Sequence, residues 1–174
     1  MNIVLFGFKK SGKSHYGSQL ATRLGRAFMD TDRLLELLFA SEKGRELSCR
    51  EIFLEYGPEA FRAMEYDVIM SLQDVQNSVI AVGGGAVLDS SISETLQKMG
   101  QLVYLDVEKK ELKKRMLTGD QPAYLDTDNP EAAFEQMYDE RLRHYEELPA
   151  YRLVTAGKSD AAILDELAGL IDGG

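Results

Sequence analysis

A chain of 174 residues, of which 44% are hydrophobic and 28% charged, is long enough to form one domain around a sizeable core. Its formal charge of −9 repels a phosphate backbone, and no apolar run reaches the ~20 residues of a membrane-spanning helix, so we expect neither a nucleic-acid nor a membrane partner. The single cysteine, Cys49, excludes an internal disulfide, and the N-terminus lacks the basic start of a signal peptide. We therefore expect one domain over residues 1–174, working as a cytoplasmic monomer.

The first half of the chain alternates short apolar runs with helical patterns. Residues 3–6 are an apolar run that predicts a buried strand, and a helix is predicted over residues 14–24. A second short strand, residues 27–29, leads into Asp30. Beyond it, Gly57-Pro58 interrupts the helical pattern. The predicted helical segments on the two sides of this break are residues 33–39 and 49–56 before it, and the segment from Phe61 to Val75 after it.

The second half continues the alternation and adds one long loop. Strands are predicted at residues 79–82, 102–105 and 151–154, and helices at residues 92–99, 108–117, 131–148 and 160–171. Residues 118–130 are rich in turn formers, and a loop of this length in a compact domain is typical of an active-site lid. The alternation predicts an α/β domain: a five-stranded parallel sheet with helices on both faces and a mobile lid.

Residues 7–14, with the sequence GFKKSGKS, form a complete phosphate-binding loop between a predicted strand and a predicted helix. Backbone N–H groups of such a loop and the positive end of the following helix bind phosphates. Lys13 is expected to reach the β- and γ-phosphates of ATP, and Ser14 to offer its hydroxyl to one Mg²⁺ ion. A mere turn with a solvated helix start is the alternative, and it does not explain why every fixed position of the motif is present. The predicted nucleotide-binding residues of this P-loop are Gly7, Lys9, Lys10, Ser11, Gly12, Lys13, Ser14 and His15.

Two acids close the second predicted strand. Asp30 and Asp32 are two residues apart, and in extended backbone this spacing sends both side chains to one face. One carboxylate is expected to hold the metal or its waters, and the other the acceptor hydroxyl. The alternative is that Asp32 caps the following helix. Together with the P-loop, this pair predicts an ATP-dependent small-molecule kinase.

With these motifs in place, the chain resembles the shikimate kinase family along nearly its whole length. The resemblance is carried by the P-loop, FMDTD at residues 28–32, IF at 52–53, GPEAFRAME at 57–65, GGGAV at 83–87, and an arginine at 141 four residues before a tyrosine. It implies a P-loop kinase of the nucleoside-monophosphate-kinase type. Such an enzyme transfers the γ-phosphoryl of ATP to the 3-hydroxyl of shikimate in aromatic amino-acid biosynthesis.

The resemblance also implies roles for individual residues. Asp30 resembles the magnesium-side acid, and Asp32 the acid that binds a shikimate hydroxyl and is a candidate base. Arg62 and Arg141 match the arginines that hold the shikimate carboxylate, a group that guanidinium forks bind well. By position alone, both arginines are more typical of a solvated surface: Arg62 is placed for a helical ion pair with Glu59 or Glu65, and Arg141 lies on a charged helix.

Further positions define the rest of the implied site. Gly84 and Gly85 would line the acceptor pocket, in an acceptor-binding region that includes residues 31–65. Arg115 would flank the adenine, opposite residues 156–158. His15 and His144 lack the partners of a catalytic or metal-binding histidine, and Cys49 is interpreted as a packing residue.

The chain departs from the family pattern in the lid. The resemblance implies an arginine followed by Pro-Leu-Leu, but residues 121–125 are QPAYL, so the predicted catalytic residues are Lys13, Asp32 and the neutral Gln121. Either another cation substitutes, or the alignment slips although no arginine lies between Arg115 and Arg141, or the enzyme is slow or uses a related acceptor. The candidate substitutes are Lys9, Lys10, Lys113 and Lys114.

Two other functions remain open at this stage. The first is a P-loop kinase for another hydroxylated acceptor, such as gluconate or a nucleoside monophosphate. The second is an ATP-binding domain with a weakened lid and little transfer activity. The acceptor-side acid Asp32 argues against the second, since a pure binder has no need of it.

Overall fold

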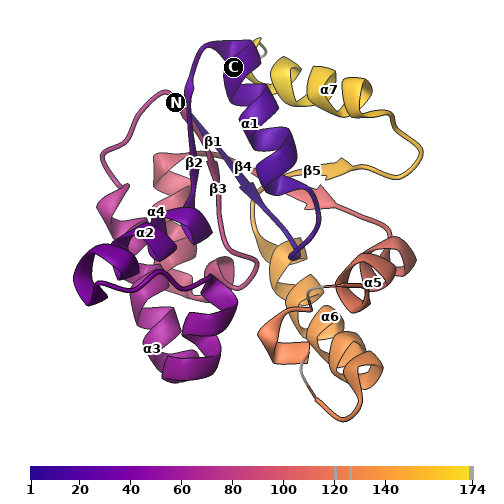
Figure 1. Cartoon of the computed structure of the whole chain (residues 1–174). Coiled ribbons are helices and arrows are strands. Elements are labelled where there is room, and N and C mark those ends of the chain that lie inside the picture. Colours follow the sequence, from indigo (N-terminus) through magenta and orange to yellow (C-terminus); the bar gives the residue numbers. More distant parts are fainter. Residues whose placement is uncertain (120, 126, 173–174) are drawn as a thin grey trace.

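A computed structural model describes residues 1–119, 121–125 and 127–172 (Figure 1). These residues contain a five-stranded parallel sheet with the strand order β2-β3-β1-β4-β5. The strands are β1 (Asn2–Phe6), β2 (Ala27–Asp30), β3 (Ser78–Ala81), β4 (Gly100–Asp106) and β5 (Tyr151–Val154). The predicted parallel sheet is confirmed, and each strand lies within two residues of its predicted bounds.

The described residues form α-helices between the strands, and the short 3-10 helices η1 (Ala86–Leu88) and η2 (Ala123–Leu125). The helix predicted at residues 49–56 and the next one are joined as α3, but Gly57 has φ 83° and ψ 168°, so the predicted break is confirmed. No helix within the described ranges has the length and apolar content needed to cross a lipid bilayer. The α-helices are α1 (Lys13–Leu24), α2 (Thr31–Lys43), α3 (Cys49–Ser71), α4 (Ser90–Met99), α5 (Lys109–Leu117), α6 (Pro130–Glu147) and α7 (Asp160–Asp172).

Helices cover both faces of the sheet because side chains of a strand alternate between its faces. Ile3 and Leu5 of β1 pack with α1 and α7 on one face. Val4 and Phe6 pack on the other face, against α3, α4, α5 and α6. Figure 1 shows α1 and α7 side by side above the sheet, with the other helices gathered on its opposite side. This is the three-layer arrangement expected from the sequence.

A third apolar cluster holds the acceptor-side helices together. Leu35 and Phe39 of α2 pack against Ile52, Phe61 and the rest of the α3 face, and these side chains are buried. The cluster meets the sheet cluster around Val4 and Phe6 through Leu34, which packs against both. It therefore fixes α2 and α3 as a unit beside the carboxyl ends of the strands.

The side chain of Asn2 joins the amino ends of the central strands. It is fully buried, and its amide nitrogen donates to the carbonyls of Val75 (2.7 Å) and Met99 (3.1 Å). Its amide oxygen accepts from the backbone N–H of Ser78 at 3.0 Å. These bonds satisfy backbone groups that would otherwise be buried without partners.

The contact between β1 and β4 at this end leaves no room for a side chain at Gly100. A methyl group there would overlap the backbone carbonyl of Asn2, whereas nothing lies within 4 Å of one at the exposed Gly169 of α7. We expect Gly100→Ala to destabilise the protein by about 1–3 kcal/mol. The matched change Gly169→Ala should stabilise it by about 0.5–1 kcal/mol through helix propensity. Chemical denaturation measures the free energy of unfolding of both variants. Equal changes of the same sign would contradict the close contact between β1 and β4 at Gly100.

Candidate active site

The P-loop is a tight turn closed on itself by its lysine. Gly7 and Gly12 have φ of 139° and 99°, values that favour glycine, and Gly12 is the N-cap of α1. The ammonium of Lys13 donates to the carbonyls of Gly7 (3.0 Å) and Phe8 (2.8 Å). Burial lowers the pKa of Lys13 to about 8, and the carboxylates of Asp32 and Asp30 oppose this shift. An anionic phosphate would restore the charge balance around this ammonium.

A cavity opens over this loop. It is bounded by P-loop residues on one side and by Asp30 and Asp32 on the other, next to the ends of β2 and β3. Its place at the P-loop and at the N-terminus of α1 suits a polyphosphate, because helix N-termini favour anions. The predicted nucleotide-binding residues that line it are Lys9, Lys10, Gly12, Lys13, Ser14 and His15.

Asp30 and Asp32 both face this cavity, but not for the reason expected from the sequence. The prediction assumed extended backbone through both residues, whereas only Asp30 belongs to β2 and Asp32 lies in the first turn of α2. The N-cap of α2 is Asp30, not Asp32: its carboxylate accepts from the backbone N–H of Asp32 at 3.1 Å and of Arg33 at 3.4 Å. The change from strand to helix therefore brings the two carboxylates together.

Ser14 and Asp30 form an oxygen pair beside the phosphate cavity. The hydroxyl of Ser14 donates to the carboxylate of Asp30. Within the described ranges, no group of three or more His, Cys, Asp or Glu side chains is arranged to hold a metal. This donor set fits Mg²⁺, which is commonly held by one or two protein oxygens, water and substrate phosphates.

A second cavity adjoins the first one and shares lining residues with it. Its walls come from α2, α3, the glycine run at residues 83–85, α6 and residues 122–124, and combine charged groups with aromatic rings. The residues predicted for the acceptor, Asp32, Arg62, Gly84, Gly85 and Arg141, all line it. In total, three arginines and two carboxylates line the pocket, and such a pocket suits an anionic, hydroxylated molecule.

The glycine run lets the backbone approach the charged side chains closely. A Cβ at Gly85 would overlap the guanidinium of Arg62, and one at Gly84 would lie 3.3 Å from Nη1 of Arg141. The N–H of Gly83 donates to the buried hydroxyl of Thr31 at 3.1 Å, and Tyr145 donates to the carbonyl of Gly84. The run is thereby fixed to α2 on one side and to α6 on the other.

Each predicted arginine of the acceptor pocket has a defined neighbour. Arg62 is paired at 2.5 Å with Glu65, which is 3% exposed. Burial raises the pKa of Glu65, and the charge of Arg62 opposes this shift. Arg141 is buried, and its guanidinium lies over the ring of Tyr124, 4.6 Å from the centroid. The ion pair proposed as an alternative for Arg62 exists, but it lies at the pocket and not on a solvated face.

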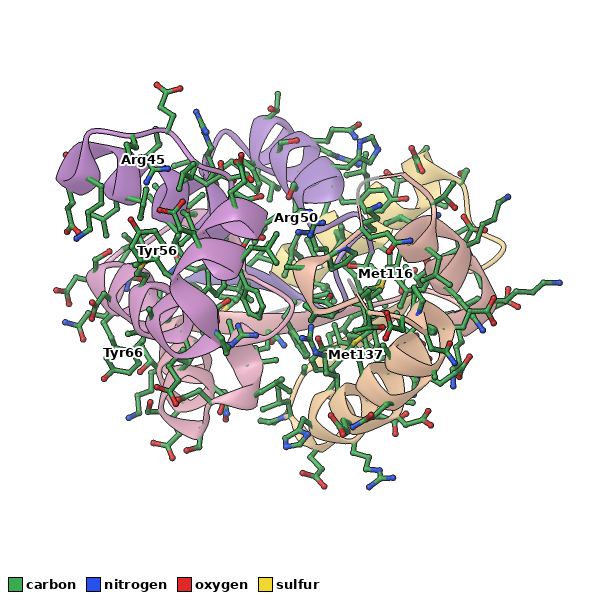
Figure 2. All side chains as sticks on the ribbon, turned by 60° about the horizontal axis from the view of Figure 1, so that its bottom comes forward. Arg45, Arg50, Tyr56, Tyr66, Met116 and Met137 are labelled. Atoms are coloured by element: carbon green, nitrogen blue, oxygen red, sulfur yellow. The ribbon has the colours of Figure 1, made fainter. Side chains whose placement is uncertain are left out.

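Several pocket residues were missed by the sequence analysis. Arg50 reaches the pocket from α3, and Figure 2 shows it on the side of that helix that faces α6. Arg50 and Phe53 share a helix face, as their three-residue spacing indicates. Phe61, Glu65 and the lid residue Tyr124 also line the pocket. The helical spacing around Arg62 was a usable signal for Phe61 and Glu65, but Tyr124 arrives only through packing of the lid.

The thiol of Cys49 is 8% exposed and belongs to the cluster between α2 and α3, which agrees with the packing role expected for it. It also borders the acceptor pocket. Burial raises the pKa of this thiol, so it stays protonated and inert.

Residues 120 and 126 of the predicted lid lie outside the described residues. Gln121 donates from its side chain to the carbonyl of Leu117 at 3.2 Å, next to the pocket residue Pro122. Arg115 is exposed; it pairs with Glu111 at 2.8 Å and donates to the carbonyl of Lys10 at 3.4 Å. Its predicted place beside an adenine stays a prediction, although the contact puts it at the edge of the P-loop.

Comparisons with known proteins agree with this geometry. The sequence model of the shikimate kinase family matches residues 9–171. A shikimate kinase of Geobacter metallireducens is 31% identical over 172 residues, covering 99% of this chain and 92% of the relative. The structure of a shikimate kinase from Acinetobacter baumannii in complex with shikimate has a TM-score of 0.86 and 28% identity, covering 99% of this chain and 93% of the other.

At the level of the fold alone, a thymidylate kinase from Candida albicans is also similar, with a TM-score of 0.56 and 18% identity over 99% of this chain and 91% of the other. The chain therefore has a P-loop kinase fold of the nucleoside-monophosphate-kinase type, as the sequence predicted.

The environment of Asp32 predicts a gain in stability when its charge is removed. Burial raises the pKa of Asp32 and the charge of Asp30 adds to this, while Lys13 and Lys9 oppose it. A carboxyl with a higher pKa in the folded chain than in the unfolded chain binds its proton more tightly when folded, so stability falls as pH rises through that pKa. Asp32→Asn should therefore raise the Tm of the ligand-free protein near neutral pH.

This gain should shrink toward acid pH, where the wild-type carboxyl becomes protonated. Thermal unfolding with a metal chelator present, across a pH series, measures it. The matched control is Asp67→Asn, which removes an equal charge from an exposed position of α3. An Asp32→Asn protein that melts no higher than this control would contradict the argument.

Proposed function

The chain belongs to the shikimate kinase family, and we propose that it transfers the γ-phosphoryl of ATP to the 3-hydroxyl of shikimate, giving shikimate 3-phosphate for aromatic amino-acid biosynthesis. Its relatives are ATP-dependent phosphotransferases that act on a hydroxyl group, and this chain is one of them. The observation that carries the choice of acceptor is the pocket beside the P-loop. There, Arg62 and Arg141 line the acceptor pocket, where their guanidinium groups suit a carboxylate, while Asp32 lines both that pocket and the phosphate cavity.

The nucleotide would bind along the P-loop, from Gly7 to His15. Loop N–H groups and the α1 N-terminus would hold the phosphates, and Lys13 would exchange its two carbonyl contacts for phosphate oxygens. Arg115, already in contact with Lys10, would lie on the adenine side. Residues 156–158 would form the opposite wall.

One Mg²⁺ ion accompanies ATP in this proposal, with Ser14 and Asp30 as the residues that hold it or its waters. The bound ion would supply charge neutralisation on the phosphates. The hydroxyl of Ser14 and the carboxylate of Asp30 are already adjacent, and this supports the assignment.

Acceptor binding would orient the reacting hydroxyl. The carboxylate of shikimate would lie between Arg62 and Arg141, with Gly84 and Gly85 against the ring. Its 3-hydroxyl would then reach Asp32, which takes the proton as the hydroxyl oxygen attacks the γ-phosphorus. The bond from that phosphorus to the bridging oxygen breaks, and ADP leaves with the electron pair. Catalysis of this kind rests mainly on positioning and charge stabilisation.

The domain organisation, compartment and oligomeric state expected from the sequence are also part of the proposal. We propose a single catalytic domain over residues 1–174, with an acceptor-binding region at residues 31–65 and a lid at residues 118–130. We also propose that the protein works as a cytoplasmic monomer; its single cysteine supports a reducing compartment.

Transfer to shikimate is tested by coupled detection of ADP with purified protein, ATP, Mg²⁺ and shikimate. We expect shikimate-dependent release of ADP, and a loss of about 10²–10⁴-fold in kcat for Asp32→Asn because the proton acceptor is removed. Gluconate and nucleoside monophosphates serve as control acceptors. No ADP release at millimolar shikimate, or faster release with a control acceptor, would contradict the proposed substrate.

Arg141 should matter for the acceptor and not for the nucleotide. Arg141→Met removes a charge-assisted contact worth about 1.5–3 kcal/mol, so kcat/KM for shikimate should fall by about 10- to 100-fold. KM for ATP should stay near its wild-type value. The control is Arg143→Met, at an exposed position of the same helix. Equal losses in both variants would show that net charge, and not the pocket contact, is responsible.

A further inference from the structure

The acceptor and phosphate cavities share Lys9, Asp32 and Gly84 among the residues that line them. A phosphoryl group that moves from nucleotide to acceptor must cross this junction. Of the three, only Lys9 carries a positive charge. Its side chain is partly buried and starts from the P-loop itself, where its backbone nitrogen would lie 3.2 Å from a Cβ placed on Gly84.

We propose that Lys9 is a catalytic residue whose ammonium stabilises the phosphoryl group in transit, a role that the neutral Gln121 cannot fill from the lid. This inference rests on the proposed kinase function and deepens it. Negative charge spreads over the oxygens of the transferred group and on the leaving oxygen, so a preorganised cation at the junction lowers the barrier.

The other lysines considered for this role are engaged or placed elsewhere. The ammonium of Lys10 donates to the carbonyls of Arg115 at 3.0 Å and Thr118 at 3.1 Å. Lys113 is paired with Glu131 at 3.2 Å and Glu135 at 3.0 Å. Lys114 is exposed on α5, outside the residues that line either cavity. Lys9 is the one of the four candidates that reaches the junction.

The arginines of the acceptor pocket are placed to bind the carboxylate of the acceptor and not the transferred phosphoryl group. Arg62 is paired with Glu65, and Arg141 lies over Tyr124. Arg50, Arg62 and Arg141 line the acceptor cavity and not the phosphate cavity. Within the described part of the chain, by contrast, the ammonium of Lys9 takes part in no hydrogen bond or ion pair, so its charge is available to a substrate.

A cation on the P-loop differs from one on a lid in a testable way. The P-loop is anchored between β1 and α1, so its charge is in place before any lid closes. The rate of transfer should then depend strongly on Lys9, and adding a charge at position 121 should matter only when Lys9 has been neutralised.

The first test compares the steady-state kinetics of the full-length wild type with Lys9→Met, Lys9→Gln and Lys9→Arg, using ATP, Mg²⁺ and shikimate. We expect each neutral variant to lose about 10²–10³-fold in kcat with a much smaller change in KM for ATP. Lys9→Arg should keep most of the activity. Lys114→Met removes the same charge from an exposed position and should behave as wild type. Matching Tm values establish that the variants are folded.

The second test adds Gln121→Arg to the wild type and to Lys9→Met. We expect the added arginine to raise kcat of the Lys9→Met variant by at least about tenfold. It should change kcat of the wild type much less, since contacts to one group are not additive. Wild-type kcat in both neutral Lys9 variants, or equal gains in kcat from Gln121→Arg in both backgrounds, would overturn the role of Lys9. The proposed function would then stand. A wild type without shikimate-dependent activity would overturn the proposed function and this role with it.

Discussion

The site depends on the parallel pairing of β1, β3 and β2, which brings three carboxyl ends to one edge of the sheet. Ala81 of β3 is in register with Leu5 of β1 and with Asp30 of β2, so the three strands end at the same level. The P-loop follows β1, the N-terminus of α2 capped by Asp30 follows β2, and the glycine run at residues 83–85 follows β3. Ligand sites of open α/β sheets form at such edges. Segments that are far apart in the sequence thus become neighbours, because the helical crossovers between parallel strands bring each carboxyl end to the same edge of the sheet.

Burial and neighbouring opposite charges act in opposite directions on the pKa values of the charged groups at this edge. Burial raises the pKa of Asp32 and of Glu65, and it lowers the pKa of Lys13. Each shift works against the charged form of its group, and the neighbouring opposite charges oppose each shift. An anionic phosphate would stabilise the charged form of Lys13. Perturbed charged groups of this kind are typical of functional sites, and they cost the ligand-free protein stability.

The sequence predicted the sheet and the P-loop because each depends on local pattern. It failed where the chain changes from strand to helix: Asp30 and Asp32 meet through the cap of α2 and not through extended backbone. Arg62 and Arg141 could be assigned only by resemblance, since their helical neighbours are more typical of a solvated surface. Arg50 and Tyr124 escaped prediction because α3 and the lid meet by tertiary packing, which leaves no periodic signal.

The single carboxylate of Asp30 links the P-loop to the start of α2, and so links the two proposed substrate sites. One of its oxygens caps α2, whose first turn carries the acceptor-side Asp32, and the other accepts from the Ser14 hydroxyl of the P-loop. If Ser14 turned toward Mg²⁺ as proposed, Asp30 would lose this hydroxyl donor while it caps α2. Any change in acceptor affinity that followed would be reciprocal by thermodynamic linkage: the acceptor would alter nucleotide affinity by the same factor.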